Sequence, residues 1–259
     1  MDRDLGVTVA IREDIPEWAV EVFSLLSLPG DLVVIVPVLA VLYLSSVSRT
    51  LLGRGESSPP TSMCDDRTAA VIAVVFGGLA LVVFLESLLG FGRPPIELHA
   101  VSASKYGFPS GHTMAATILW GGIALWAPVG RARTRFVVAG AIVAVVGVSR
   151  LALGVHYLVD VVAGVVVGTG YLLLVWPRVE TRPRYAFAVA VAIALAAVLE
   201  TGGNDRSVLA LVGTTGAAFG WQIIESNPVK TRLVATVYGL RRRFGDNGKA
   251  EVNSPTRRD

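Results

Sequence analysis

Two short segments of this 259-residue chain carry side chains suited to phosphate chemistry, and each lies beside a long apolar stretch. The first is Pro109-Ser110-Gly111-His112, and the second contains Arg150, His156 and Asp160. Histidine transfers protons and phosphoryl groups near neutral pH, and arginine presents planar donors to phosphate oxygens. Ionisable residues in membrane segments are costly, which makes them functional candidates. We therefore expect both segments to contribute to one phosphate-handling site.

The first segment has the pattern of a helix start. Pro109 disfavours helix for the residue before it, and Ser110 is a good N-cap residue. The amides of Gly111 and His112 would then point outward from a helix N-terminus, which binds anions through free N–H groups and its dipole. An ordinary helix start with an interfacial histidine is the alternative interpretation.

The second segment places a histidine and a carboxylate four residues apart. His156 and Asp160 would share one helix face, so the carboxylate can accept an imidazole N–H and fix the tautomer of the ring. Gly154 separates Arg150 from His156 and lets both side chains face one cavity. A structural Arg–Asp pair with a packed histidine is the alternative interpretation.

The composition indicates a membrane protein. Hydrophobic residues make up 53% of the chain and charged residues 17%, against about 25% charged residues in soluble domains; the mean hydropathy is +0.61. The apolar runs approach the length of a spanning helix and do not alternate as strands would. We expect an all-α, polytopic transmembrane helical bundle of about six to seven spans, without nucleic-acid partners. The expected spans are Asp31–Val47, Ala69–Gly90, His112–Ala127, Phe136–Ala152, Tyr157–Trp176, Tyr185–Leu199 and Val208–Ile224.

The basic residues concentrate in alternate connections between these spans. Connections 48–68, 128–135 and 177–184 and the tail after Ile224 are rich in arginine and lysine, and the other connections hold few. Basic loops of membrane proteins face the cytoplasm. The N-terminus and both histidine segments are therefore expected on the extracytoplasmic side of the cell membrane.

Three parts are expected along the chain. Residues 1–30 form an N-terminal segment whose interfacial helix begins near Pro16 and ends before Pro29-Gly30. Residues 31–228 form the transmembrane domain, and residues 229–259 form a basic cytoplasmic tail.

The motifs together resemble the type 2 phosphatidic acid phosphatase (PAP2) superfamily, which includes membrane lipid phosphatases and vanadium haloperoxidases. The resemblance rests on Arg93-Pro94, on residues 109–112, and on Ser149-Arg150 with His156 and Asp160. It implies a PAP2-like core and a metal-independent phosphoric monoester hydrolase that needs no cofactor. The implied partners are membrane lipids and a lipid phosphate or diphosphate substrate.

The resemblance also implies roles for the site residues. His156 attacks phosphorus and forms a phosphohistidine while Asp160 holds its ring. His112 protonates the leaving oxygen and then activates water. The remaining residues would bind the phosphate oxygens. They are Arg93, Ser110, Gly111 and Arg150.

One position departs from the family pattern. Glu86 stands seven residues before Arg93, where the family has lysine. Either the carboxylate lies near the phosphate and repels it, or it turns away to the interface. Lys105 is expected to supply the missing positive charge. A catalytically altered relative that binds phospholipids is the alternative function; an unrelated transporter and a haloperoxidase are disfavoured.

Overall fold

The computed structural model of the chain describes residues 6–52 and 61–237. Within these ranges the chain is helical, with no strand beyond an isolated β-bridge between Gly92 and Tyr106. The all-α prediction is therefore confirmed. The elements are α1 (Gly6–Glu13), α2 (Glu17–Ser27), η1 (Leu28–Gly30), α3 (Leu32–Leu52), α4 (Asp66–Leu89), η2 (Ile96–Leu98), α5 (Gly111–Trp126), α6 (Ala132–Ala152), α7 (Leu158–Val179), α8 (Pro183–Thr201) and α9 (Asp205–Glu225).

Local sequence signals set the ends of several helices. The side chain of Asp65 accepts a hydrogen bond from the Thr68 amide and caps the start of α4. Gly90, in the left-handed conformation, follows the last helical residue, Leu89. Asn204 caps α9 in the same way through the Ser207 amide. Each cap satisfies a main-chain donor that a helix start leaves without an intrahelical partner.

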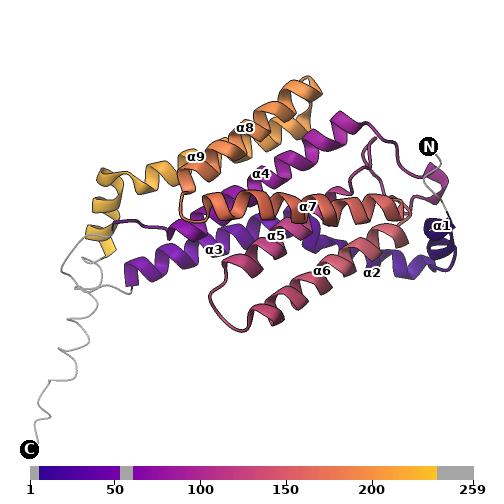
Figure 1. Ribbon diagram of the computed structural model, residues 1–259, viewed down its shortest axis with the longest axis horizontal. Helices are drawn as coiled ribbons and strands as arrows, with labels where there is room; N and C mark the ends of the chain where they lie inside the picture. Colours follow the sequence, from indigo (N-terminus) through magenta and orange to yellow (C-terminus); the bar gives the residue numbers. More distant parts are fainter. Residues whose placement is uncertain (1–5, 53–60, 238–259) are drawn as a thin grey trace, which may run out of the picture.

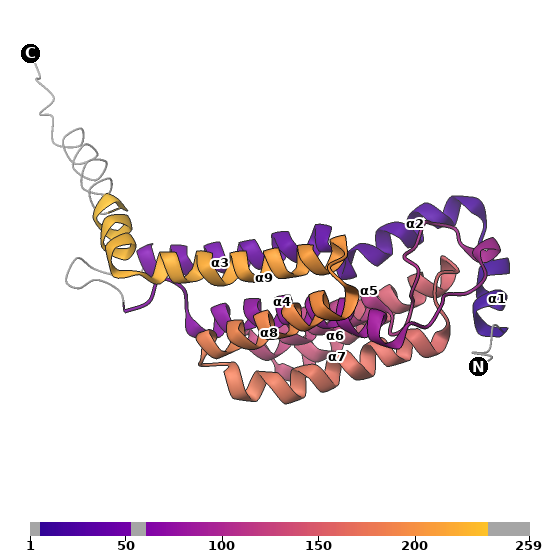
Figure 2. The same ribbon diagram turned by 90° about the horizontal axis from the view of Figure 1, so that it is seen from above.

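The long helices lie roughly along one axis and form layers. Figure 1 shows α1 and α2 at one end of the molecule and the end of α9 at the other. In Figure 2, α3 and α9 lie in a layer above the remaining long helices, and Figure 1 shows that they are apart within this layer. Helix α4 packs against α5, α8 and α9, and α5 packs against α6 and α7. The core therefore centres on α4 and α5, which carry Glu86 and His112.

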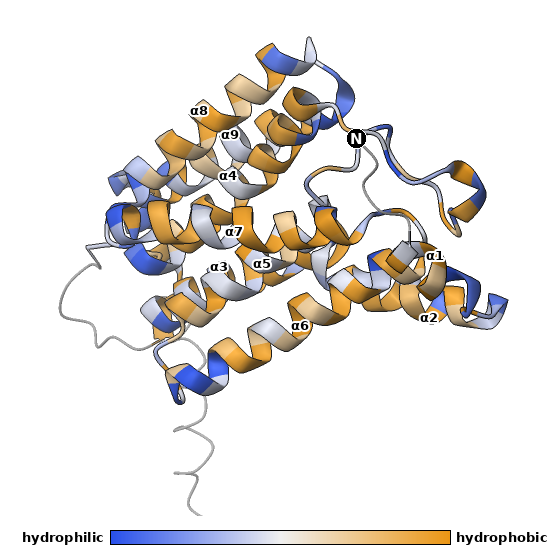
Figure 3. Ribbon diagram, turned by 45° about the vertical axis from the view of Figure 1, so that its right-hand side comes forward, coloured by the Kyte–Doolittle hydropathy of each residue, from blue (hydrophilic) through white to orange (hydrophobic). Residues whose placement is uncertain are grey.

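Six helical stretches of the described chain are long and apolar enough to cross a membrane. One of them covers Glu17–Leu52, in which η1 and Asp31 separate α2 from α3, so α2 is a separate helix that ends before Pro29-Gly30, as the sequence predicted. Hydrophilic residues gather at the helix ends, and the middles are hydrophobic (Figure 3). Helix α5 has 16 residues, about 24 Å at 1.5 Å per residue, shorter than the hydrocarbon layer. Most residues of α5 are buried, because neighbouring helices enclose it. The six long apolar helical stretches identify the chain as a multi-pass membrane protein.

The connections between the long helices divide between the two ends. At one end Arg67 donates hydrogen bonds to the carbonyl of Leu125 and to Glu180, which brings three connections together. The phosphate-chemistry segments lie at the other end, close to α1. Residues 53–60 of the predicted connection 48–68 and residues 238–259 of the predicted tail lie outside the described residues, whereas residues 227–237 are helical.

Candidate active site

The two predicted segments meet through main-chain atoms. The amide of Ser110, at the N-cap of α5, donates to the carbonyl of Asp160 in the first turn of α7, with N···O 2.9 Å. Gly164 permits this approach, because a Cβ there would lie 2.9 Å from the Ser110 carbonyl oxygen. The contact between α5 and α7 therefore brings the two segments together at one end of the bundle.

His156 lies in the connection between α6 and α7 and is 1% exposed. Its Nε2 lies 2.8 Å from Nη1 of Arg93, and its Nδ1 lies 3.4 Å from Oδ2 of Asp160. A guanidinium group only donates hydrogen bonds, so Nε2 must be the acceptor and Nδ1 carries the proton. The ring therefore directs an unprotonated nitrogen toward Arg93.

The surroundings of His156 favour its neutral form. Burial, followed by the guanidinium groups of Arg93 and Arg150, holds the pKa of His156 well below its usual value of 6.5. Desolvation and neighbouring positive charges both disfavour an imidazolium. The imidazole is therefore neutral at neutral pH, as a nucleophile must be. Asp160 is fully buried and also accepts from the Tyr157 amide at 2.9 Å, which fixes the carboxylate beside the ring.

The two arginines have different environments. Arg93 donates to the carbonyl of Val155 at 2.9 Å and to the carbonyl and hydroxyl of Ser104 at 2.6 and 2.8 Å, so it ties the connection after α4 to the His156 segment. Arg150 is 6% exposed, and its Nε has no hydrogen-bond partner among the described residues. A buried donor without a partner is costly, which makes Arg150 ready to bind an anion.

His112, in the first turn of α5, has a carboxylate partner from outside both segments. Its Nε2 lies 3.3 Å from Oδ2 of Asp31, just before α3. The same carboxylate accepts from the Val33 amide through Oδ1. Gly30 lets this segment of the chain approach α5, because a Cβ at position 30 would lie 2.3 Å from the His112 carbonyl oxygen. The start of α3 is therefore packed directly on His112.

Glu86 does not extend toward the membrane interface. It is 3% exposed, and its Oε2 lies 2.6 Å from Nη1 of Arg206 in the first turn of α9. Its Oε1 would be 2.8 Å from a Cβ at position 111, so only glycine there lets the carboxylate pack against the start of α5. Of the two interpretations left open by the sequence, the location near the site is the one observed, with an arginine as its partner.

Ser110 occupies the predicted N-cap position with a different hydrogen bond. It is fully buried, and its hydroxyl pairs with the Thr113 hydroxyl at 3.0 Å. No side chain caps the α5 N-terminus. The first amides of α5, including that of Gly111, therefore remain available to an anion.

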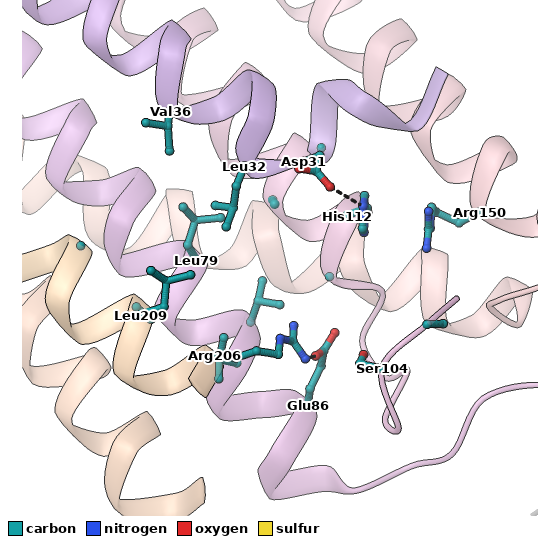
Figure 4. Close-up of a pocket in the computed structure, with 18 of the residues that line it drawn as sticks. Asp31, Leu32, Val36, Leu79, Glu86, Ser104, His112, Arg150, Arg206 and Leu209 are labelled. Carbon is teal, nitrogen blue, oxygen red and sulfur yellow. Dashed lines mark hydrogen bonds and ion pairs between the residues drawn. The ribbon is translucent and has the colours of Figure 1, made fainter. Parts of the chain in front are cut away.

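A cavity of about 430 Å³ is lined by the two arginines, His112, Asp31 and Glu86, whereas the buried His156 and Asp160 lie behind Arg93 and do not line it. Figure 4 shows His112, Asp31, Arg150 and Ser104 on one side of it, with Glu86 and Arg206 below. The other side is apolar. Its lining there includes Leu32, Val36, Phe76, Leu79, Val83 and Leu209. The cavity therefore has a charged part and an apolar part, as an amphiphilic ligand requires.

Lys105 does not line this cavity. Its Nζ lies 5.1 Å from the ring centroid of Tyr106, and the residue lines a neighbouring pocket. Arg93 contributes to both pockets. His99 lies in the neighbouring pocket and pairs with the carbonyl of Pro94 at 3.0 Å. The remaining predicted residues meet around the main cavity or beside His156.

Two cavity residues were not predicted as site residues. Asp31 was expected only to begin a helix, and Arg206 was counted only among the few basic residues of its side of the membrane. Both lie at helix starts that are distant in sequence from the motifs. An ionisable residue at the end of an apolar stretch was the signal available for each of them.

Comparisons with known proteins agree with this geometry. Residues 67–184 match the PAP2 superfamily. The fold is similar to the crystal structure of a transmembrane PAP2-type phosphatidylglycerolphosphate phosphatase from Bacillus subtilis, with a TM-score of 0.54 and 23% identity. That similarity covers 66% of this chain and 81% of the other. A search of curated proteins finds no match. Residues 67–184 of this membrane protein thus belong to the PAP2 superfamily, as the three motifs predicted.

Proposed function

We propose that this chain is an integral-membrane phosphatase that hydrolyses a lipid phosphate or diphosphate monoester through a phosphohistidine. The observation that carries the proposal is the state of His156. Its unprotonated Nε2 faces Arg93, and its other nitrogen faces the buried carboxylate of Asp160. A phosphate bound at Arg93 would place its phosphorus close to this nitrogen, which is the geometry of nucleophilic attack.

In the first step, Nε2 of His156 attacks phosphorus. The N–P bond forms while the bond from phosphorus to the lipid oxygen breaks. His112, protonated beside the Asp31 carboxylate, gives its proton to the departing oxygen. Asp160 balances the positive charge that develops on the attacking ring. Arg150, which lacks a partner for its Nε, would bind the phosphoryl oxygens as charge builds on them.

In the second step, water replaces the histidine. His112, now neutral, accepts a proton from the water as its oxygen attacks phosphorus. The N–P bond breaks, and its electron pair returns to Nε2 of His156. Inorganic phosphate leaves, and the site regains neutral His156 and protonated His112. One histidine thus acts as acid and then as base.

The shape of the cavity supports a lipid substrate. The charged groups line one part of it, and residues of α3, α4 and α9 form an apolar part, including Val36, Leu79 and Leu209. These helices also expose large hydrophobic side chains to the surroundings, as lipid-facing helices do. A phosphate monoester with a hydrocarbon chain satisfies both parts, whereas a small polar ester leaves the apolar part empty.

The charge distribution supports an active site on the extracytoplasmic side of the cell membrane. The connections around Arg67, Arg131 and Arg182 carry most of the basic residues between helices and lie at the end opposite His156. The positive-inside rule assigns that end to the cytoplasm.

The test is phosphate release by the purified full-length protein in detergent, with lipid phosphates as substrates. His156→Ala should remove turnover and the radiolabelled phosphoenzyme that wild-type protein gives with a ³²P-labelled lipid phosphate after rapid denaturing quenching at alkaline pH, where phosphohistidine is stable. His99→Ala is the matched control, because this histidine lies at the same end of the molecule but lines only the neighbouring pocket. It should retain both signals.

Two outcomes would refute the proposal. Near-normal turnover in His156→Ala would show that another group is the nucleophile. Phospholipid binding without phosphate release from any lipid phosphate would instead identify a catalytically altered, phospholipid-binding relative.

A further inference from the structure

The Glu86–Arg206 pair lies in the substrate cavity without belonging to any of the motifs. Glu86 is buried, whereas the side chain of Arg206 is 49% exposed and lines the cavity. The one hydrogen bond of the Arg206 side chain within the described part of the chain uses Nη1 and goes to Glu86. A guanidinium group has five N–H donors, so most donors of Arg206 remain available to a ligand.

Arg206 lies where the apolar part of the cavity meets the charged part. In Figure 4 its guanidinium lies between the apolar side chains Leu79 and Leu209 and the group formed by His112 and Arg150. A lipid whose phosphate lies in the charged part and whose hydrocarbon lies against the apolar part would therefore lie close to Arg206, which lines the same cavity. The group next to the scissile phosphate is the part of the lipid that meets this arginine.

Glu86 sets the spacing between Arg206 and the start of α5. One of its carboxylate oxygens packs against Gly111, and the other bonds to Arg206. The uncapped helix start and the guanidinium group are thus separated by the width of one carboxylate. This spacing suits two directly linked phosphates, one at the helix start and one at Arg206, better than two phosphates separated by a glycerol.

A purely structural role accounts poorly for this pair. Removing two charged groups from water costs more than their attraction returns in many proteins, so ion pairs of this kind contribute little to stability. Here the carboxylate is buried, and the arginine remains half exposed inside the cavity. This arrangement holds a positive charge at one point of the cavity wall, and it does so where a ligand can reach it.

We propose that Arg206 binds the second phosphate of a lipid diphosphate, and that Glu86 is the residue that positions it. The inference rests on the proposed function and narrows its substrate class to lipids with two directly linked phosphates. The terminal phosphate meets His156, Arg93 and Arg150. The inner phosphate, which becomes the leaving group, meets Arg206.

The test compares two substrates with the same hydrocarbon, farnesyl diphosphate and farnesyl monophosphate, on the full-length protein in detergent. Wild-type protein should have the higher kcat/KM for the diphosphate. Arg206→Gln should lower the ratio of the two kcat/KM values about tenfold, the low end for a charge-assisted hydrogen bond at a partly exposed site. Arg206→Lys should keep most of the preference, because it keeps the charge.

Two further variants protect the experiment from effects on folding. Arg206→Gln leaves the Glu86 carboxylate buried without a charged partner, which can destabilise the protein. The double variant Glu86→Gln with Arg206→Gln removes both charges. It should show the same loss of preference for the diphosphate, and it should elute from a size-exclusion column at the same volume as folded wild-type protein. Arg184→Gln, on an exposed arginine at the far end of α8, is the matched control and should leave the ratio unchanged.

The outcomes separate this inference from the proposed function. An equal loss for both substrates, or an unchanged ratio, in Arg206→Gln and in the double variant would overturn the role of Arg206. A wild-type preference for the monophosphate would overturn it as well. If wild-type protein releases phosphate from neither farnesyl substrate and from no other lipid phosphate, the proposed function is overturned, and this inference with it.

Discussion

Substituting Asp31 by asparagine should separate proton donation by His112 from the rest of the chemistry. The asparagine keeps the cap on the Val33 amide and an acceptor beside the ring, and it removes only the charge. At the 3.3 Å between Nε2 and Oδ2, Coulomb's law gives about 1–5 kcal/mol for effective dielectric constants of about 80 to 20. The side chains of His112 and Asp31 are 30% and 37% exposed, so solvent screening favours the low end.

We therefore expect protonated His112 to lose about 1–1.5 kcal/mol of stabilisation, which corresponds to a fall of about tenfold in the rate of lipid phosphate hydrolysis. The loss should depend on the leaving group. The alkoxide that leaves from a lipid monophosphate needs a proton as it departs, whereas nitrophenolate does not. In Asp31→Asn, hydrolysis of p-nitrophenyl phosphate should thus change much less than that of a lipid phosphate.

The matched control is Asp14→Asn, which removes an exposed carboxylate at the same end of the molecule. Its rates on both substrates should equal those of wild-type protein. Equal slowing of both substrates in Asp31→Asn would mean that the carboxylate acts on binding or folding, and the reasoning about proton donation would then be wrong.

Three further predictions concern other parts of the chain. Because burial, Arg93 and Arg150 hold the pKa of His156 well below 6.5, protonation should inactivate the nucleophile only well below pH 6.5, and Arg93→Gln should move the acid limb of the kcat/KM profile to higher pH. Gly154→Ala should lower the melting temperature in detergent by several degrees, because its φ is +69° and a Cβ would lie 2.0 Å from a carbonyl oxygen; Gly216→Ala, which faces open space, should not. Burial raises the pKa of the Cys64 thiol to about 12, so this native thiol should stay unlabelled in intact cells. A membrane-impermeant maleimide should then label a cysteine placed at Asn204 but not one placed at Arg182. The opposite labelling pattern would reverse the proposed orientation.

The sequence predicted the fold well where one physical signal dominated. Long apolar runs without alternation indicate membrane helices. The helix starts at Glu17 and Gly111 follow closely after Pro16 and Pro109, which disfavour helix for the residue before them, although Ser110 does not cap α5 with its side chain. Helix α1 was not predicted, because Gly6–Glu13 is short and has no cap of its own. It is held by tertiary contacts, including a hydrogen bond from the Thr8 hydroxyl to the carbonyl of His156.

The site was predictable only in part. Spacing brought His156 and Asp160 together, since residues four apart share a helix face. Spacing carries no information about Asp31 and Arg206, which reach the cavity from helices outside the matched segment. Glu86 could be noticed as unusual for its position, but its partner lies 120 residues away in sequence. Pairings of this kind are set by how α3 and α9 pack, which local patterns do not encode.

The hydrogen bond between the Ser110 amide and the Asp160 carbonyl has an evolutionary consequence. It joins the anion-binding helix start to the nucleophile segment through atoms that every residue type except proline supplies. Apart from Gly164, which the close approach requires, the residues around it can change without losing the link, as long as the local backbone is kept. Proline at position 110 is the single replacement that deletes the donor outright. The alignment of the two halves is therefore tolerant to mutation, and the residues facing the ligand are free to diverge toward new substrates.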